Sequence, residues 1–129
     1  IGVRLVGSEM CIRDRENYTK LETISSDIIR EYNFLVEEHF RAKHTVSEYA
    51  ELLFKSPKTL SNLFAKLGEK TPLEYIKERI LLEARRLLMY TEKPIKEIAY
   101  ELGYEDIQSF SRFFKKHEQI SPSDFRKNQ

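Results

Sequence analysis

Apolar side chains recur at the three- and four-residue spacing of α-helices along most of the chain from residue 27 onward. Over residues 27–41 the apolar stripe consists of Ile28, Ile29, Tyr32, Leu35, Val36 and Phe40. Over residues 72–91 it consists of Leu73, Ile76, Ile80, Ala84, Leu87 and Leu88. Both stripes are typical of helices that bury one face. The pattern predicts an all-α fold, with residues 72–91 as its longest helix.

Residues 94–117 have the pattern of two short helices joined by a tight turn. The apolar side of the first helix consists of Ile95, Ile98, Ala99 and Leu102. Gly103 follows, where a turn needs a residue without Cβ strain. The second helix has the apolar stripe Phe110, Phe113 and Phe114, and its remaining face is polar or basic. This arrangement predicts a helix-turn-helix, the motif that places its second helix in a DNA major groove.

A longer signature extends over this motif and the residues after it. It consists of Ile95, Ile98, Ala99, Gly103, Tyr104, Asp106, Phe110, Ser111, Arg112, Phe114, Lys115, Lys116, Ser121, Pro122, Phe125 and Arg126. This set resembles the signature of the AraC/XylS-type transcription regulators. The resemblance implies their C-terminal DNA-binding domain, in which two helix-turn-helix motifs are joined by a long connecting helix.

The chain contains an internal repeat, as that arrangement requires. A shift of 50 residues places Leu60–Lys66 over Phe110–Lys116 and Thr71–Pro72 over Ser121–Pro122. Before the second helix the shift falls to 49, so the second motif has one more residue in its turn. Repetition of this kind is evidence for the fold that does not depend on the family. We expect motif one at 45–67, the connecting helix at 72–91, motif two at 94–117 and a C-terminal helix at 121–128.

Residues that cap helices mark the expected starts of these elements. Residues 45–48 and 71–74 have the form of capping boxes, in which the first side chain and the fourth residue satisfy each other's backbone amides. Pro57 and Pro72 stand at first helical positions, where the missing amide costs no hydrogen bond. Two positions depart from the family, because Glu69 and Gln119 stand where glycine usually ends each recognition helix. We expect Gly68 to take over the first role, and either Gln119 becomes left-handed or the second recognition helix ends in another way.

Charge is distributed unevenly along the chain, although the formal net charge is only +1. From residue 42 onward there are 16 Lys and Arg against 13 Asp and Glu, a net charge of +3. Residues 56–67 contain two basic residues and no acidic one, and residues 107–117 contain three basic residues and no acidic one. Positive charge concentrated on both second helices is what a phosphate-facing surface requires.

The family resemblance assigns base contacts to the first two turns of each second helix. Carried over by position, the expected base-contacting residues are Lys58, Ser61, Asn62, Ile107, Gln108, Ser111 and Arg112. The expected phosphate contacts are Lys66, Lys115 and Lys116. Arg112 suits guanine, and Asn62 and Gln108 suit adenine. The alternatives are a helix-surface role for the serines, solubility for the lysines, and an ion pair of Arg112 with Asp106 or Glu105.

The expected partner is double-stranded DNA, and the resemblance implies RNA polymerase as a protein partner and an activating role. It also implies an upstream effector-binding and dimerisation domain, so we expect this chain to be a C-terminal fragment of a cytoplasmic bacterial protein. No catalytic, metal-binding or cofactor-binding pattern stands out, and no apolar run reaches the roughly 20 residues of a membrane span. The alternative function is a helical interaction module that binds an acidic protein through the basic helices.

The first 26 residues share no periodicity with the rest of the chain. Residues 5–14 resemble the translation of a sequencing adapter, so we expect residues 1–15 to be a non-native tail. Residues 16–26 are polar, and we predict a linker there or the frayed start of the next helix. The DNA-binding domain is then expected to occupy residues 27–129.

Overall fold

The computed structural model describes residues 13–67 and 70–128, which contain seven helices and no strand. The all-α prediction is therefore confirmed. The helices are α1 (Arg13–His39), α2 (Val46–Leu52), α3 (Pro57–Lys66), α4 (Pro72–Tyr90), α5 (Ile95–Glu101), α6 (Ile107–Glu118) and α7 (Pro122–Lys127). Within the described ranges, no helix combines the length and the apolar character that crossing a membrane needs.

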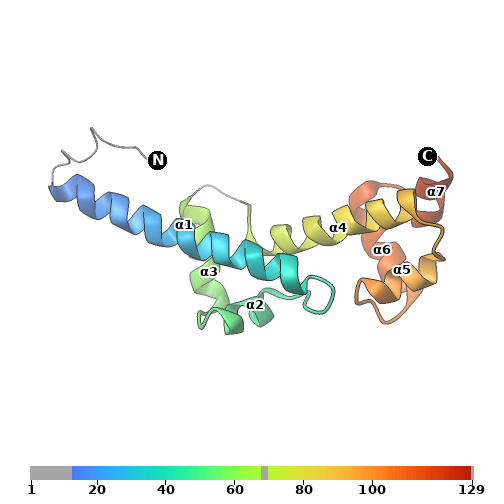
Figure 1. Ribbon diagram of the computed structural model, residues 1–129, viewed down its shortest axis with the longest axis horizontal. Helices are drawn as coiled ribbons and strands as arrows, with labels where there is room; N and C mark the ends of the chain where they lie inside the picture. The colour runs from blue at the N-terminus through green and yellow to red at the C-terminus, as the bar shows by residue number, and fades with distance from the viewer. Residues whose placement is uncertain (1–12, 68–69, 129) are drawn as a thin grey trace.

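The helices form two lobes along α4 (Figure 1). In the first lobe, α1, α2 and α3 pack on one another and on α4. In the second lobe, α5 and α7 pack on α4, and α6 packs on α5 and α7. The predicted architecture, two helix-turn-helix motifs joined by a long helix, is thus present. The connecting helix is not the longest, however, because α1 has 27 residues and α4 has 19.

The linker predicted at residues 16–26 is wrong and the helical alternative holds, because α1 runs through these residues without a break. These residues contain neither proline nor glycine, so nothing in them ends a helix. Ser25 is buried at 7% exposure, and its small side chain suits a packed helix face as well as a cap. The predicted non-native tail falls mostly outside the described residues, since only its last three residues belong to α1.

Each lobe has its own aromatic core. In the first lobe, Tyr32 is fully buried and its ring contacts Tyr49, Phe64 and Tyr75. Its hydroxyl donates a hydrogen bond of 2.7 Å to the carbonyl of Pro72, which ties α1 to the first turn of α4. In the second lobe, the buried residues include Ile98, Leu102, Phe110 and Phe114. The predicted stripes therefore face the core, except that Leu73 is 39% exposed.

Both predicted capping boxes are present, at Thr45 with Glu48 and at Thr71 with Glu74. At the other end of α4, Arg126 of α7 donates hydrogen bonds to the carbonyls of Leu88 (3.1 Å), Lys93 (2.7 Å) and Thr91 (3.2 Å). Carbonyls at a helix C-terminus lack partners within the helix. The Arg of the C-terminal signature is therefore a structural residue that fastens α7 to α4.

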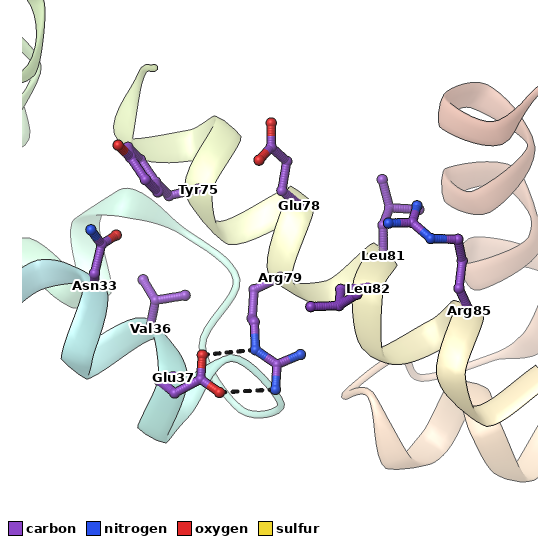
Figure 2. A pocket seen from close by; sticks show the side chains of 9 residues that line it. All are labelled: Asn33, Val36, Glu37, Tyr75, Glu78, Arg79, Leu81, Leu82 and Arg85. Carbon is purple, nitrogen blue, oxygen red and sulfur yellow. Dashed lines mark hydrogen bonds and ion pairs between the residues drawn. The ribbon is translucent and has the colours of Figure 1, made fainter. Parts of the chain in front are cut away.

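The first lobe is also fastened to α4 by an ion pair across a surface groove (Figure 2). Arg79 of α4 reaches Glu37 of α1 with two hydrogen bonds, of 2.8 and 2.9 Å. These bonds hold the pKa of Glu37 below its ordinary value. Because Glu37 is largely exposed, we expect the pair to orient α1 more than to stabilise the fold.

Candidate nucleic-acid interface

The two candidate recognition helices, α3 and α6, begin in the same way. Ser56 precedes α3, and its hydroxyl accepts a hydrogen bond from the amide of Thr59 (3.1 Å). Asp106 precedes α6, and its carboxylate accepts one from the amide of Ser109 (2.7 Å). That bond, followed by the Ser109 side chain, lowers the pKa of Asp106 below its ordinary value. Side-chain caps of this type fix where a helix starts and how its first turn is oriented.

The turns that lead into these helices have the same hydrogen-bond pattern. The amide of Lys55 donates to the carbonyl of Ala50 at 2.9 Å, and the amide of Tyr104 donates to Ala99 at 2.9 Å. Phe54 and Gly103 occupy the equivalent left-handed positions, with φ of 57° and 92°. Two residues separate Gly103 from the helix cap Asp106, whereas one residue separates Phe54 from the helix cap Ser56. The extra residue predicted for the second turn is confirmed.

Gln119 ends α6 with φ of 69°, the left-handed conformation expected where the family usually has glycine. Its own side-chain amide donates to the carbonyl of Lys116 at 3.3 Å, which gives one of the last carbonyls of the helix a partner. The expected capping role of Gly68, and the position of Glu69, lie outside the described residues.

The predicted base-contacting residues lie on the outer faces of α3 and α6. Three pairs are equivalent by the 50-residue shift, and they are Lys58 with Gln108, Ser61 with Ser111, and Asn62 with Arg112. All six are exposed except Ser111, which is partly buried, as is Ile107 in the first turn of α6. A shallow hollow beside α6 is lined by Gln108, Ser111, Arg112, Lys115 and Ser121. Four of these five residues were predicted from the sequence.

The cations on these faces form no ion pair within the described residues. Lys58, Lys66, Arg112, Lys115 and Lys116 are all exposed. None of the five takes part in an ion pair in the part of the chain that the structure describes. The alternative ion pair of Arg112 with Asp106 or Glu105 is therefore absent there. The positive charge of both faces is available to a ligand.

His117 lies in the last turn of α6, and its pKa is lowered. It is lowered below its ordinary value by partial burial first, and then by the charges of Lys77 and Lys116. A positive potential disfavours the protonated imidazole. Lys77 of α4 thus adds to the positive field beside α6, and the sequence pattern had not singled it out.

A family model described as a helix-turn-helix domain matches residues 49–128. The regulatory protein SoxS of Salmonella typhimurium is 36% identical over 91 residues, which cover 70% of this chain and 85% of SoxS. The chain belongs to the AraC/XylS family of transcription regulators. The expected family is thereby confirmed, and with it the domain to which the chain corresponds.

Solved structures of AraC-type domains have the same fold. The C-terminal domain of AraT, a response regulator from Geobacillus stearothermophilus, is 33% identical, with a TM-score of 0.72 over 79% of this chain and 85% of that one. An AraC-type regulator from Chromobacterium violaceum is 28% identical, with a TM-score of 0.67 over 81% and 93% of the two chains. The chain spans about a third of the length of two Escherichia coli regulators that it also matches.

The sequence signal for the AraC-type site was strong within the helices and weak between them. Ser121 was recognised as part of the signature, but its place beside Arg112 depends on how the chain turns after α6. Lys77 belongs to the connecting helix, and only the packing of the second lobe brings it near His117. Helical periodicity assigns a residue to a face of its own helix and says nothing about the neighbouring helix.

Proposed function

We propose that this chain binds duplex DNA as the DNA-binding part of a transcription regulator and reads two successive major grooves with α3 and α6. The observation that carries the proposal is the pair of equivalent outer faces, each with polar residues in its first two turns and cations outside any ion pair. The two faces lie on lobes at either end of α4 (Figure 1). Duplex DNA is a polyanion whose major groove recurs along its axis, so it can present an equivalent surface to each of the two faces.

The length of α4 supports contacts with successive grooves. Its 19 residues correspond to about 28 Å of helix at 1.5 Å per residue. Successive major grooves on one face of B-DNA are about 34 Å apart. Because the recognition helices flank the two ends of α4, a separation of this order is within their reach. We therefore propose that one chain binds an asymmetric site made of two boxes, which are the short base sequences contacted by α3 and by α6.

The side chains suggest different roles in this complex. Arg112 can donate two hydrogen bonds to guanine, and Gln108 and Asn62 can pair with adenine through both polar atoms of their amides. Ile107 can offer only an apolar contact, for example to a thymine methyl group. We assign Lys58, Ser61 and Ser111 to the base-contacting set as well. Lys66, Lys115 and Lys116 are assigned to phosphates, which fix register without reading sequence.

A wider role in transcription is also part of the proposal. Membership of the AraC/XylS family supports RNA polymerase as a protein partner and activation as the outcome of binding. No residue of the chain carries these two assignments by itself, so they rest on the family. A transcription assay with purified polymerase on a promoter containing the two boxes tests them, since activation requires more transcript when the chain is added.

The division of roles predicts different effects for two substitutions on α6. Arg112→Ala should weaken binding to the preferred site by about 1–3 kcal/mol and relax the preference at one base pair. Lys116→Ala should weaken binding to all duplexes alike and reduce the salt dependence by about one phosphate contact. Fluorescence anisotropy on the preferred duplex and on single-base variants, at several salt concentrations, measures both effects.

Three outcomes of that experiment contradict the proposal. Equal losses on every duplex for both variants would refute the assignment of Arg112 to a base. A preferred duplex that binds no better than a random one would refute sequence reading by this chain. Binding that does not weaken with salt would point away from DNA, toward the acidic-protein alternative.

A further inference from the structure

The two lobes touch each other away from the connecting helix. The loop between α1 and α2 lies against the turn between α5 and α6. Nε2 of His44 donates a hydrogen bond of 2.8 Å to the carbonyl of Leu102, and the His44 ring lies 5.0 Å from that of Tyr104, centre to centre. The carbonyl of Arg41 lies so close to Gly103 that a Cβ there would be 2.0 Å from the oxygen.

The loop that makes this contact is itself fastened to the middle of α4. Nη2 of Arg41 lies 3.1 Å from Oε2 of Glu83, and its guanidinium lies over the ring of Phe40 at 4.5 Å. Glu83 is only 4% exposed and also pairs with Arg79 (3.4 Å) and Arg86. A buried carboxylate with three cationic partners holds its neighbours in one geometry. The first lobe therefore presents a fixed loop to the second.

The contact between the lobes explains why the equivalent turns of the two motifs carry different residues. Phe54 has the same left-handed role in motif one as Gly103 has in motif two, yet Phe54 is 94% exposed. The first turn can carry a large side chain because that side chain projects into solvent. The second turn has no room for even a Cβ, because the loop of the first lobe packs on its backbone. The glycine thus marks the contact between the lobes as well as the turn.

We propose that His44 is a positioning residue, whose contact with the α5–α6 turn sets the spacing between the two recognition helices and hence between the two DNA boxes. The proposal rests on the proposed function. Without the His44 contact, the lobes are held by α4 and by the packing of the Arg41 carbonyl on Gly103, and small hinge movements at the α4 termini change the separation of α3 and α6. One inserted base pair moves a box by about 3.4 Å along the helix and rotates it by about 35°. Two recognition helices held at a fixed separation cannot both reach their boxes after that change. Recognition helices that can move relative to each other can reach both.

The test uses the whole chain and duplexes that carry both boxes in the spacing that the wild type selects, or with one or two base pairs inserted between them. For the wild type, we expect one inserted base pair to weaken binding by about a hundredfold, because only one of the two recognition helices can then bind its box. For His44→Ala, we expect about three- to tenfold weaker binding at the selected spacing. Once one recognition helix is bound, the other is held less closely at its box, so its effective concentration there is lower. The penalty for the insertion should then fall to less than about tenfold.

Three controls separate positioning from folding. Duplexes with a single box should bind the wild type and His44→Ala equally, because each recognition helix keeps its own structure in the variant. His39→Ala changes the same residue type five positions earlier, in the last turn of α1, and should behave as the wild type. His44→Gln keeps a side-chain N–H that can donate to the Leu102 carbonyl and should restore much of the spacing preference.

The outcomes are distinct. An unchanged insertion penalty in His44→Ala overturns the positioning role. So does a loss of affinity that is the same on single-box and two-box duplexes, since it would indicate damage to one reader. If the wild type itself prefers no two-box duplex, the proposed function fails first, and the spacing role fails with it.

Discussion

Gly103→Ala is expected to destabilise the fold, whereas a change at the equivalent position of the first motif is not. Gly103 has φ of 92°, which costs an alanine about 1–2 kcal/mol. Its new Cβ would also lie 2.0 Å from the carbonyl oxygen of Arg41, closer than atoms can approach, so the turn and the loop must separate. That movement breaks the hydrogen bond from His44 to Leu102, which contributes about 1 kcal/mol.

The sum is a loss of about 2–3 kcal/mol in the free energy of unfolding. For a chain of 129 residues, 2 kcal/mol corresponds to a fall in Tm of roughly 7 °C. Phe54→Gly is the matched change, because it relieves the left-handed strain at φ of 57° and removes a side chain that is 94% exposed. We expect it to be neutral or to stabilise by up to about 1 kcal/mol.

Urea denaturation of the three proteins, followed by circular dichroism, gives the free energies directly. Far-ultraviolet signal at zero denaturant shows whether each variant is folded before the comparison is made. If Gly103→Ala unfolds at the same urea concentration as the wild type, the close approach of the two lobes in this structure is refuted. If Phe54→Gly destabilises the protein by more than 1 kcal/mol, the first turn packs on something that its exposure does not reveal.

Two further predictions concern a buried hydrogen bond and a helix cap. Tyr32→Phe removes the donor to the Pro72 carbonyl and should cost about 1 kcal/mol, which is roughly 4 °C in Tm by thermal denaturation. An unchanged Tm would show that this bond does not fasten α1 to α4. The lowered pKa of Asp106 means that its contribution to stability is present above the ordinary Asp pKa and is lost as pH falls through the lowered value. The urea midpoint of the wild type should therefore exceed that of Asp106→Ala near neutral pH and converge with it in acid; a difference that is constant with pH would contradict the capping role.

The helices of both motifs could be predicted from the sequence because each signal in them is local. Thr45 with Glu48 and Thr71 with Glu74 satisfy amides within one turn, and both capping boxes are present in the structure. A left-handed Gln119 was one of two predicted endings of α6, because the family usually has glycine at this position, and its φ is 69°. The internal repeat supplied the long-range information, since two copies of one pattern must fold alike.

The features that the sequence did not reveal depend on contacts between distant elements. The residues at 16–26 have little apolar content, so their helical state in α1 carries no periodic signal. The contact of His44 with Leu102 joins residues 58 positions apart, and no local pattern marks it. The one hint was the difference between Phe54 and Gly103 at equivalent positions, which is explained only when the Arg41 carbonyl is seen beside the second turn. The base and phosphate assignments, the upstream domain and the non-native tail stay predictions.

The measurement that tests the central claim most directly is affinity selection of random duplex DNA on the whole chain, followed by sequencing of the retained duplexes. Reading by both α3 and α6 predicts two enriched boxes whose centres are about 10 base pairs apart. One enriched box would contradict the claim that both helices read bases, and retention without any enrichment would contradict sequence reading altogether.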